Sequence, residues 1–201
     1  MAMKKWVLAK TDKEQAKALA EECEVDAFTA LIAASRGYSD AAALEEFLSD
    51  EPSVSDYREL ADVEKAAEII NESIEKDNLI AVYGDYDCDG VTATALLVDY
   101  LRNRGARVIY YIPDRVDEGY GMHVDSVQSL YDKGVNTIIT VDNGIAAVKE
   151  IEFANSLGMT VVVTDHHLPQ DVLPDAAAVV DPHRKDCPST YKTICGAAVA
   201  L

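Results

Sequence analysis

Hydrophobic positions in the first part of the chain recur every three or four residues, as they do along one face of a helix. This pattern predicts helices over residues 12–23, 26–37, 39–48 and 53–77. Gly37 ends the second of these helices, and Ser39 or Asp40 can cap the third. We therefore expect residues 1–78 to form an N-terminal helical segment that packs on the rest of the chain.

The pattern changes at Leu79, where short continuous apolar runs begin to alternate with amphipathic helices. The runs predict strands over residues 79–85, 107–113, 137–144, 160–167 and 176–182. The segments between the first four strands predict helices over residues 90–105, 123–134 and 145–158. Continuous apolar strands that alternate with helices are typical of βαβ units. Residues 79–201 are therefore expected to form an α/β domain with a doubly wound, mostly parallel sheet.

Charged side chains gather where the predicted strands end. In chain order, the residues at the ends of the first four strands are Asp85, Asp87 and Asp89, then Arg115, then Asp142, and finally Asp165, His166 and His167. In an open parallel sheet the ligand crevice lies outside the carboxyl ends of the strands. We therefore expect these carboxylates and imidazoles to meet at one edge of the sheet.

The acidic loop allows two other interpretations. The stretch "DYDCDG" (85–90) matches the start of an EF-hand calcium loop, but position 12 of that loop would be Leu96 instead of a bidentate glutamate. A surface turn in which Asp85 or Asp87 caps the next helix needs only one aspartate. Carboxylates and imidazoles suit Mn²⁺ or Mg²⁺, and two such ions about 4 Å apart, bridged by a carboxylate such as Asp142, can hydrolyse phosphoesters. We therefore expect a site for two divalent cations.

Composition limits the class of protein. The formal net charge of −18 argues, on charge alone, against a nucleic-acid partner. No apolar run approaches the roughly 20 residues of a membrane span, and no signal segment opens the chain, so we expect a cytoplasmic protein without a membrane partner. The four cysteines include no CxxC motif and suit free thiols in a reducing compartment. A zinc site built from His183, Cys187 and Cys195 is therefore an unfavoured alternative.

Several motifs together are similar to those of a known superfamily. The stretches "GDYDCDGVTATALL" (84–97), "TVDNGI" (140–145) and "VTDHHLP" (163–169) resemble the successive motifs of the DHH phosphoesterases, which are named after the Asp-His-His triplet. Within that superfamily, the form of the first motif resembles the RecJ single-strand-specific exonucleases. The stretches "YIPDRVDEGYGM" (111–122) and "DHHLPQDVLPDAAAVVDPHR" (165–184) are also RecJ-like. The resemblance covers nearly the whole chain.

The resemblance implies a metal-dependent exonuclease that releases mononucleotides from the 5′ end of single-stranded DNA in recombination and repair. Its cofactors would be two Mn²⁺ or Mg²⁺ ions, and its partners single-stranded DNA and a single-strand-binding protein or helicase. The implied direct metal ligands are Asp87, Asp89, Asp142 and His166. Asp85 would be a further ligand or the partner of a ligand. His167 would contact the scissile phosphate, Asp165 would orient the histidine pair, and Arg115 would grip a terminal phosphate.

The chain also departs from the RecJ pattern. The family needs another metal-binding aspartate beyond the triplet, and this sequence offers only Asp181 and Asp186. RecJ proteins also continue into a DHHA1 domain and an oligonucleotide-binding fold. We therefore expect an N-terminal fragment, with a DHH domain incomplete at its C-terminus and with weak or no activity. Three alternatives remain open: a phosphoesterase for short oligonucleotides, cyclic dinucleotides or pyrophosphate; a non-catalytic DHH scaffold; and, for Arg115, an ion pair with Asp117 or Glu118.

Overall fold

The computed structural model describes residues 7, 10–49 and 56–201, and the chain divides into two compact units, Met1–Val54 and Ser55–Leu201. This division places residues 56–78 in the same unit as the sheet, whereas the hydrophobic pattern groups them with the preceding helices. Among the described residues, no helix is both long enough and apolar enough to cross a membrane.

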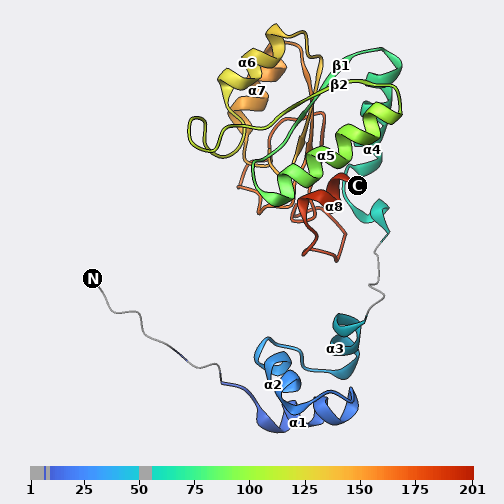
Figure 1. Cartoon of the computed structure of the whole chain (residues 1–201), viewed down its shortest axis with the longest axis vertical. Coiled ribbons are helices and arrows are strands. Elements are labelled where there is room, and N and C mark those ends of the chain that lie inside the picture. The colour runs from blue at the N-terminus through green and yellow to red at the C-terminus, as the bar shows by residue number, and fades with distance from the viewer. Residues whose placement is uncertain (1–6, 8–9, 50–55) are drawn as a thin grey trace, which may run out of the picture. The chain divides into compact units, whose positions relative to one another are not determined.

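The first unit contains three short helices within its described residues. They are α1 (Lys13–Glu22), α2 (Ala27–Ser35) and α3 (Ala41–Leu48) (Figure 1). An aspartate precedes each helix and accepts hydrogen bonds from N–H groups of its first turn, at Asp12, Asp26 and Asp40. The helices bury a small core of Leu19, Ala30, Ala33 and Leu44. Aspartate caps and a short apolar face therefore explain why these segments are helical.

The fourth predicted helix is interrupted, so the prediction of one continuous helix over 53–77 is wrong. A 3₁₀ turn, η1 (Tyr57–Glu59), precedes helix α4 (Val63–Glu75). Between them, Asp62 adopts a left-handed backbone conformation with φ of 63°. The Asp62 carboxylate accepts a hydrogen bond of 2.7 Å from the Arg184 guanidinium, so a contact distant in sequence holds the break. The first three residues of the predicted helix lie outside the described residues.

The second unit is built on a sheet of five strands that all run parallel. The strands are β1 (Leu79–Tyr83), β2 (Arg107–Tyr111), β3 (Thr137–Val141), β4 (Thr160–Thr164) and β5 (Ala178–Val180). Their order across the sheet is β2-β1-β3-β4-β5. The direction of winding reverses between β1 and β3, which is where a parallel sheet opens a ligand crevice.

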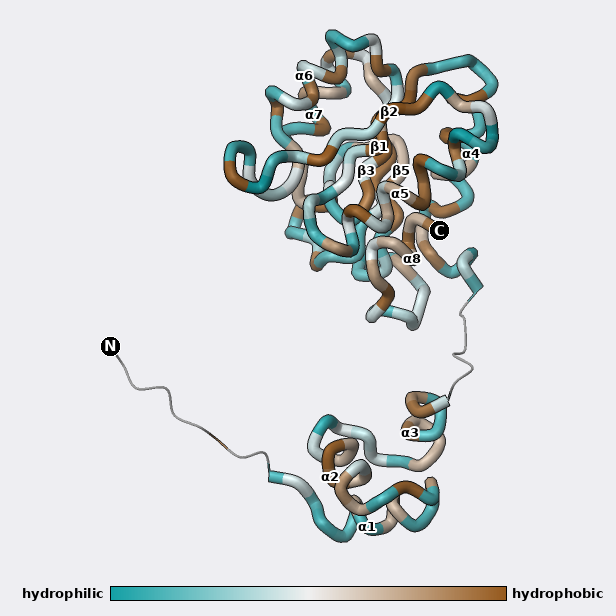
Figure 2. Tube along the Cα trace, viewed as in Figure 1, coloured by the Kyte–Doolittle hydropathy of each residue, from teal (hydrophilic) through white to brown (hydrophobic). Residues whose placement is uncertain are grey.

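Helices cover both faces of the sheet, which confirms the predicted doubly wound α/β fold (Figure 1). Helix α4 covers one face together with α5 (Cys88–Asn103) and α8 (Gly196–Ala200), and α6 (Val124–Asp132) and α7 (Val148–Ser156) cover the other. Along β1, Ile80 and Val82 pack toward the first face, and Ala81 and Tyr83 toward the second. Because both faces are covered, the interior strands are largely apolar, and Figure 2 shows hydrophobic residues along them.

Candidate metal centre

Four neighbouring strands each end in a buried aspartate. Asp85 follows β1, Asp142 follows β3, Asp165 follows β4 and Asp181 follows β5, and each residue is at most 1% exposed. A buried carboxylate is costly unless it is protonated, paired or bound to a metal ion. All four aspartates lie at the carboxyl edge of the sheet, and Asp85 and Asp142 flank the point where the winding reverses, which is where a parallel sheet opens a ligand crevice.

Two groups of possible ligand atoms meet at this edge, and they share one residue. One group consists of Asp85, Asp87 and Asp142, and the other of Asp142, His166 and His167. Within each group, one ligand atom per residue lies within 4.8 Å of the others. Asp142 is the residue common to both groups, so it lies where the two groups meet.

Asp142 itself has an unusual environment. Its φ of 60° is a left-handed conformation, which costs a non-glycine residue free energy. Its Oδ1 atom lies 3.0 Å from Nε2 of His166 but is buried without a hydrogen-bond partner of acceptable geometry. Burial, followed by the charges of Asp89 and Asp87, raises the pKa of Asp142 to about 7. A bound cation would relieve both the unpaired oxygen and the repulsion, so these residues fit a divalent metal ion.

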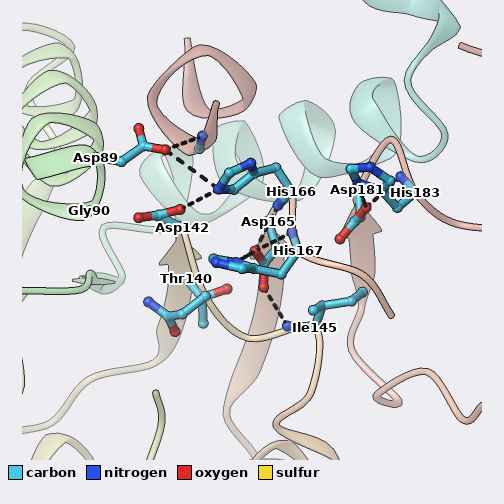
Figure 3. A network of polar contacts seen from close by, with 12 residues as sticks. Asp89, Gly90, Thr140, Asp142, Ile145, Asp165, His166, His167, Asp181 and His183 are labelled. Carbon is cyan, nitrogen blue, oxygen red and sulfur yellow. Dashed lines mark hydrogen bonds and ion pairs between the residues drawn. The ribbon is translucent and has the colours of Figure 1, made fainter. Parts of the chain in front are cut away.

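The other two aspartates of the acidic loop lie at the start of α5. This helix begins at Cys88, two residues earlier than the sequence predicts. Asp87 caps the helix, because its Oδ1 accepts a hydrogen bond of 2.9 Å from the Gly90 N–H. Asp89 lies in the first turn, and its Oδ2 is 3.5 Å from Nε2 of His166 (Figure 3). The start of the helix therefore fixes two predicted metal ligands relative to the end of β1.

Asp165 orients the His167 ring through a hydrogen bond with Nδ1. Its Oδ1 lies 2.7 Å from Nδ1 of His167, and its Oδ2 accepts a hydrogen bond of 2.9 Å from the Ile145 N–H (Figure 3). Burial raises the pKa of Asp165, but these hydrogen bonds outweigh burial and leave the pKa below its usual range. The hydrogen bond with Asp165 in turn raises the pKa of His167 to about 8. The side chain of His167 is therefore oriented and favours its charged form near neutral pH.

Arg115 contacts Tyr86, the residue between Asp85 and Asp87 in the acidic loop. Its guanidinium carbon is 5.4 Å from the centre of the Tyr86 ring, a cation–π contact. Among the described residues it makes no ion pair with Asp117 or Glu118. Glu118 instead accepts a hydrogen bond from the Tyr111 hydroxyl. The structure thus does not form the ion pair that was the alternative for Arg115.

Tyr120 is a residue of this centre that the sequence interpretation missed. Its hydroxyl oxygen lies 3.4 Å from the backbone oxygen of Asp142 and 3.4 Å from a ring nitrogen of His167. It stands between Gly119 and Gly121, whose φ values of 84° and 87° are left-handed conformations that favour glycine. The tight turn was visible in the motif "EGYG", and an aromatic residue flanked by two such glycines was the available signal.

The two aspartates considered as a further metal ligand have different positions. Asp181 lies at the edge of the sheet, and its Oδ2, like Oδ1 of Asp85, is buried without a hydrogen-bond partner. Burial raises the pKa of Asp181 to about 7 and also raises the pKa of Asp85. Asp186 instead forms an ion pair of 2.7 Å with Arg184 and has a side chain that is 64% exposed. Asp181 is therefore the only one of the pair at this edge, and it belongs to neither ligand group.

These groups predict a pH dependence of stability in the absence of metal. The folded pKa values of Asp142 and Asp181 are raised to about 7 and that of His167 to about 8. The folded chain therefore binds more protons than the unfolded chain between about pH 4 and pH 8. Because the unfolded state then binds fewer protons, the free energy of unfolding falls as pH rises through this window. In EDTA, the melting temperature measured by circular dichroism should be lower at about pH 8 than at about pH 5.5.

The control is Asp142→Asn, which cannot titrate and should flatten the pH dependence in part. A melting temperature that rises across the same window would contradict the burial of Asp142 and Asp181 and the hydrogen bond between His167 and Asp165.

Comparison with known proteins identifies the family. A family model described as "DHH family, N-terminal domain" matches residues 79–200, which is more than half of the chain. The matched region contains the residues of both ligand groups.

Curated relatives share this similarity. The chain is 37% identical over 198 residues to the single-stranded-DNA-specific exonuclease RecJ of Bacillus subtilis, a match that covers 98% of this chain and 25% of that protein. It is 40% identical over 169 residues to the protein of the same name from Escherichia coli, covering 84% of this chain and 29% of that one. The chain therefore spans between 25% and 29% of the length of these relatives.

Solved structures give the same result. A crystal structure of exonuclease RecJ bound to manganese is 36% identical, with a TM-score of 0.65 over 70% of this chain and 36% of that chain. A structure of RecJ in complex with Mn²⁺ from Thermus thermophilus is 29% identical, with a TM-score of 0.69 over 96% of this chain and 26% of that chain. The chain therefore belongs to the DHH family, and its sheet unit is a RecJ-like DHH domain.

Proposed function

We propose that this chain is the metal-binding part of an exonuclease that removes mononucleotides from the 5′ end of single-stranded DNA. The observation that carries the proposal is the shared position of Asp142 in two groups of ligand atoms. Two bound cations would supply an activated water and would neutralise the phosphate oxygens during hydrolysis of the phosphodiester.

The positions of the acidic residues support a division of roles. Asp142 would hold both cations, and Asp87 would bind one of them beside it. Asp89 and His166 would bind the other, since Nε2 of His166 lies within 3.5 Å of an oxygen of Asp89 and of Asp142. Asp85 would bind a cation or support Asp87, because one of its buried oxygens has no hydrogen-bond partner. Carboxylates and imidazole are ligands that suit Mn²⁺ and Mg²⁺.

His167 is suited to contact the phosphate itself. A raised pKa of about 8 keeps its imidazole largely protonated at neutral pH, and a protonated imidazole can donate a hydrogen bond to a phosphate oxygen. Asp165 fixes the ring through its hydrogen bond with Nδ1 and is itself nearly inaccessible. In this proposal His167 contacts the scissile phosphate and Asp165 orients it.

The substrate class rests on the relatives. The proteins from Bacillus subtilis and Escherichia coli are named single-stranded-DNA-specific exonucleases, and solved RecJ structures carry Mn²⁺ or Mg²⁺. Arg115 is exposed, and its guanidinium makes no ion pair among the described residues, so it is available for a terminal phosphate. With a net charge of −18, the chain needs such local positive charge and its cations to approach DNA.

The test is release of mononucleotides from 5′-labelled single strands in Mn²⁺ or Mg²⁺. The 201-residue chain should show little activity, since its matches cover only 25% and 29% of the two relatives described above. The same chain extended through a DHHA1 region should degrade the strand, and Asp87→Ala in the extended chain should abolish degradation. The matched control is Asp125→Ala, which removes an exposed carboxylate from α6 and should leave the rate unchanged.

Other outcomes would replace this proposal. Faster hydrolysis of short oligonucleotides, cyclic dinucleotides or pyrophosphate would indicate a small-substrate phosphoesterase. An extended chain that binds Mn²⁺ but hydrolyses none of these substrates would indicate a non-catalytic scaffold.

A further inference from the structure

The first turn of α8 lies directly against the metal centre. The N–H of Gly196 donates a hydrogen bond of 2.7 Å to Oδ2 of Asp89, and the N–H of Ala197 donates one of 2.8 Å to Oδ1. Both oxygens of one predicted ligand are thus bound by backbone donors more than 100 residues away in sequence. In Figure 3 the faint red ribbon of α8 lies next to the Asp89 side chain, and a dashed line joins the Asp89 carboxylate to a backbone nitrogen.

Gly196 also touches the second carboxylate of this group and leaves no space for a side chain. A Cβ atom at Gly196 would lie 2.5 Å from Oδ1, 2.7 Å from Cβ and 2.8 Å from Cγ of Asp142. Asp142 has little room to yield, because it is 1% exposed and its N–H donates a hydrogen bond to the Thr164 carbonyl oxygen. A larger residue at position 196 would therefore displace α8 from the two carboxylates.

The core holds α8 in this position. Ala197 and Val199 pack in the same hydrophobic cluster as Ala93 and Leu97 of α5, the helix whose first turn carries Asp89. The same hydrophobic cluster therefore supports both the helix that donates the hydrogen bonds, α8, and the helix that carries the Asp89 carboxylate, α5.

We propose that the first turn of α8 is a positioning element of the metal centre and that Gly196 is the residue that permits it. This inference rests on the proposed metal site. Charge-assisted hydrogen bonds from two backbone N–H groups fix the rotamer of Asp89 toward His166. The same donors offset part of the repulsion between Asp89 and Asp142 before a cation arrives. Gly196 acts through these carboxylates and touches neither the substrate nor the cation.

The test compares Mn²⁺ affinity with fold stability in three variants of the 201-residue chain. Gly196→Ala should weaken Mn²⁺ binding, measured by calorimetric titration, by about tenfold or more, as loss of supporting contacts around metal ligands typically does. Ala197→Pro replaces the N–H that binds Oδ1 of Asp89 with a ring carbon, which removes this donor and displaces the oxygen. It should also weaken Mn²⁺ binding. Ala198→Gly is the control, since Ala198 is exposed on the same helix and its change lowers only helix propensity.

The control separates positioning from general loosening of α8. Ala198→Gly should lower the melting temperature while its Mn²⁺ affinity stays within about twofold of wild type. If Gly196→Ala prevents folding, the Mn²⁺ affinity of Ala197→Pro tests the inference in its place. Wild-type Mn²⁺ affinity in the folded variants of Gly196 and Ala197, or equal weakening of Mn²⁺ binding by Ala198→Gly, would overturn this inference but not the proposed metal site. Absence of Mn²⁺ binding by the wild-type chain would overturn the metal site and this inference with it.

Discussion

Replacing Asp142 by alanine is expected to abolish measurable Mn²⁺ binding by the chain. Asp142 contributes a ligand atom to both groups at the edge of the sheet. Its loss therefore removes an anionic oxygen from the ligands of each predicted cation. Changing a residue that only supports a ligand costs about 10- to 100-fold in affinity, and loss of a shared ligand should cost about 100-fold or more. Calorimetric titration with Mn²⁺ measures this loss directly, and binding equal to wild type would refute the assignment.

Thermal unfolding gives an independent measure of the same change. At a Mn²⁺ concentration of about 100 times the wild-type dissociation constant, binding should stabilise the folded chain by about 2.7 kcal/mol. A variant that binds 100-fold more weakly would gain only about 0.4 kcal/mol at that concentration. Asp125→Ala, which removes an exposed carboxylate of the same charge, should keep the full gain. A similar loss in this control would indicate a non-specific effect of net charge.

Replacing His167 by alanine should lower the rate of single-strand degradation by about 10²- to 10⁴-fold in the extended chain, the range found when a positioned acid–base group is removed. The reason is the loss of a protonated imidazole beside the phosphate. Mn²⁺ binding should change much less, because the proposed ligands are the carboxylates and His166, and the proposed contact of His167 is the phosphate. The measurement is the steady-state rate of mononucleotide release with and without saturating Mn²⁺. A wild-type rate in this variant would contradict the role of His167.

Asp165→Asn tests the same pair through its pH profile. The hydrogen bond with Asp165 is the largest cause that raises the pKa of His167 to about 8. Without the carboxylate, that pKa should fall toward its ordinary value of about 6.5. If the protonated imidazole is the active form, activity should decline at a lower pH than in wild type and recover below about pH 6. A pH profile identical to wild type would show that Asp165 does not act through His167.

Much of this architecture could be predicted from the sequence, because its signals are local. The apolar runs beginning at Leu79 predicted the strands, since both faces of a parallel sheet are covered and the pattern is continuous. The predicted strands over 137–144 and 160–167 placed Asp142 and Asp165 near their carboxyl ends, and the observed strands stop directly before these two residues. The fold then brings these ends to one edge, and the resemblance of the acidic and Asp-His-His motifs to RecJ proteins agreed with that placement.

The parts that could not be predicted depend on contacts between distant segments. The break before α4 is held by Arg184 bound to Asp62, a contact 122 residues apart in sequence. The hydrogen bonds from Gly196 and Ala197 to Asp89 also join distant residues, and a short run of small residues carries no sign of a partner. The hydrophobic period reports which face of a helix is buried but does not report which carboxylate its first turn meets.

The membership of Asp142 in both ligand groups has a consequence for how the centre would fill. Two cations that share a ligand are thermodynamically linked, so the occupancy of one position changes the affinity of the other by a coupling free energy, equal in both directions. The first ion would offset the repulsion that Asp89 and Asp87 exert on Asp142. It would also place a positive charge beside the second position. The balance of these two effects sets the steepness of the binding isotherm. That steepness is therefore a property of the two coupled binding events and not of either ion alone.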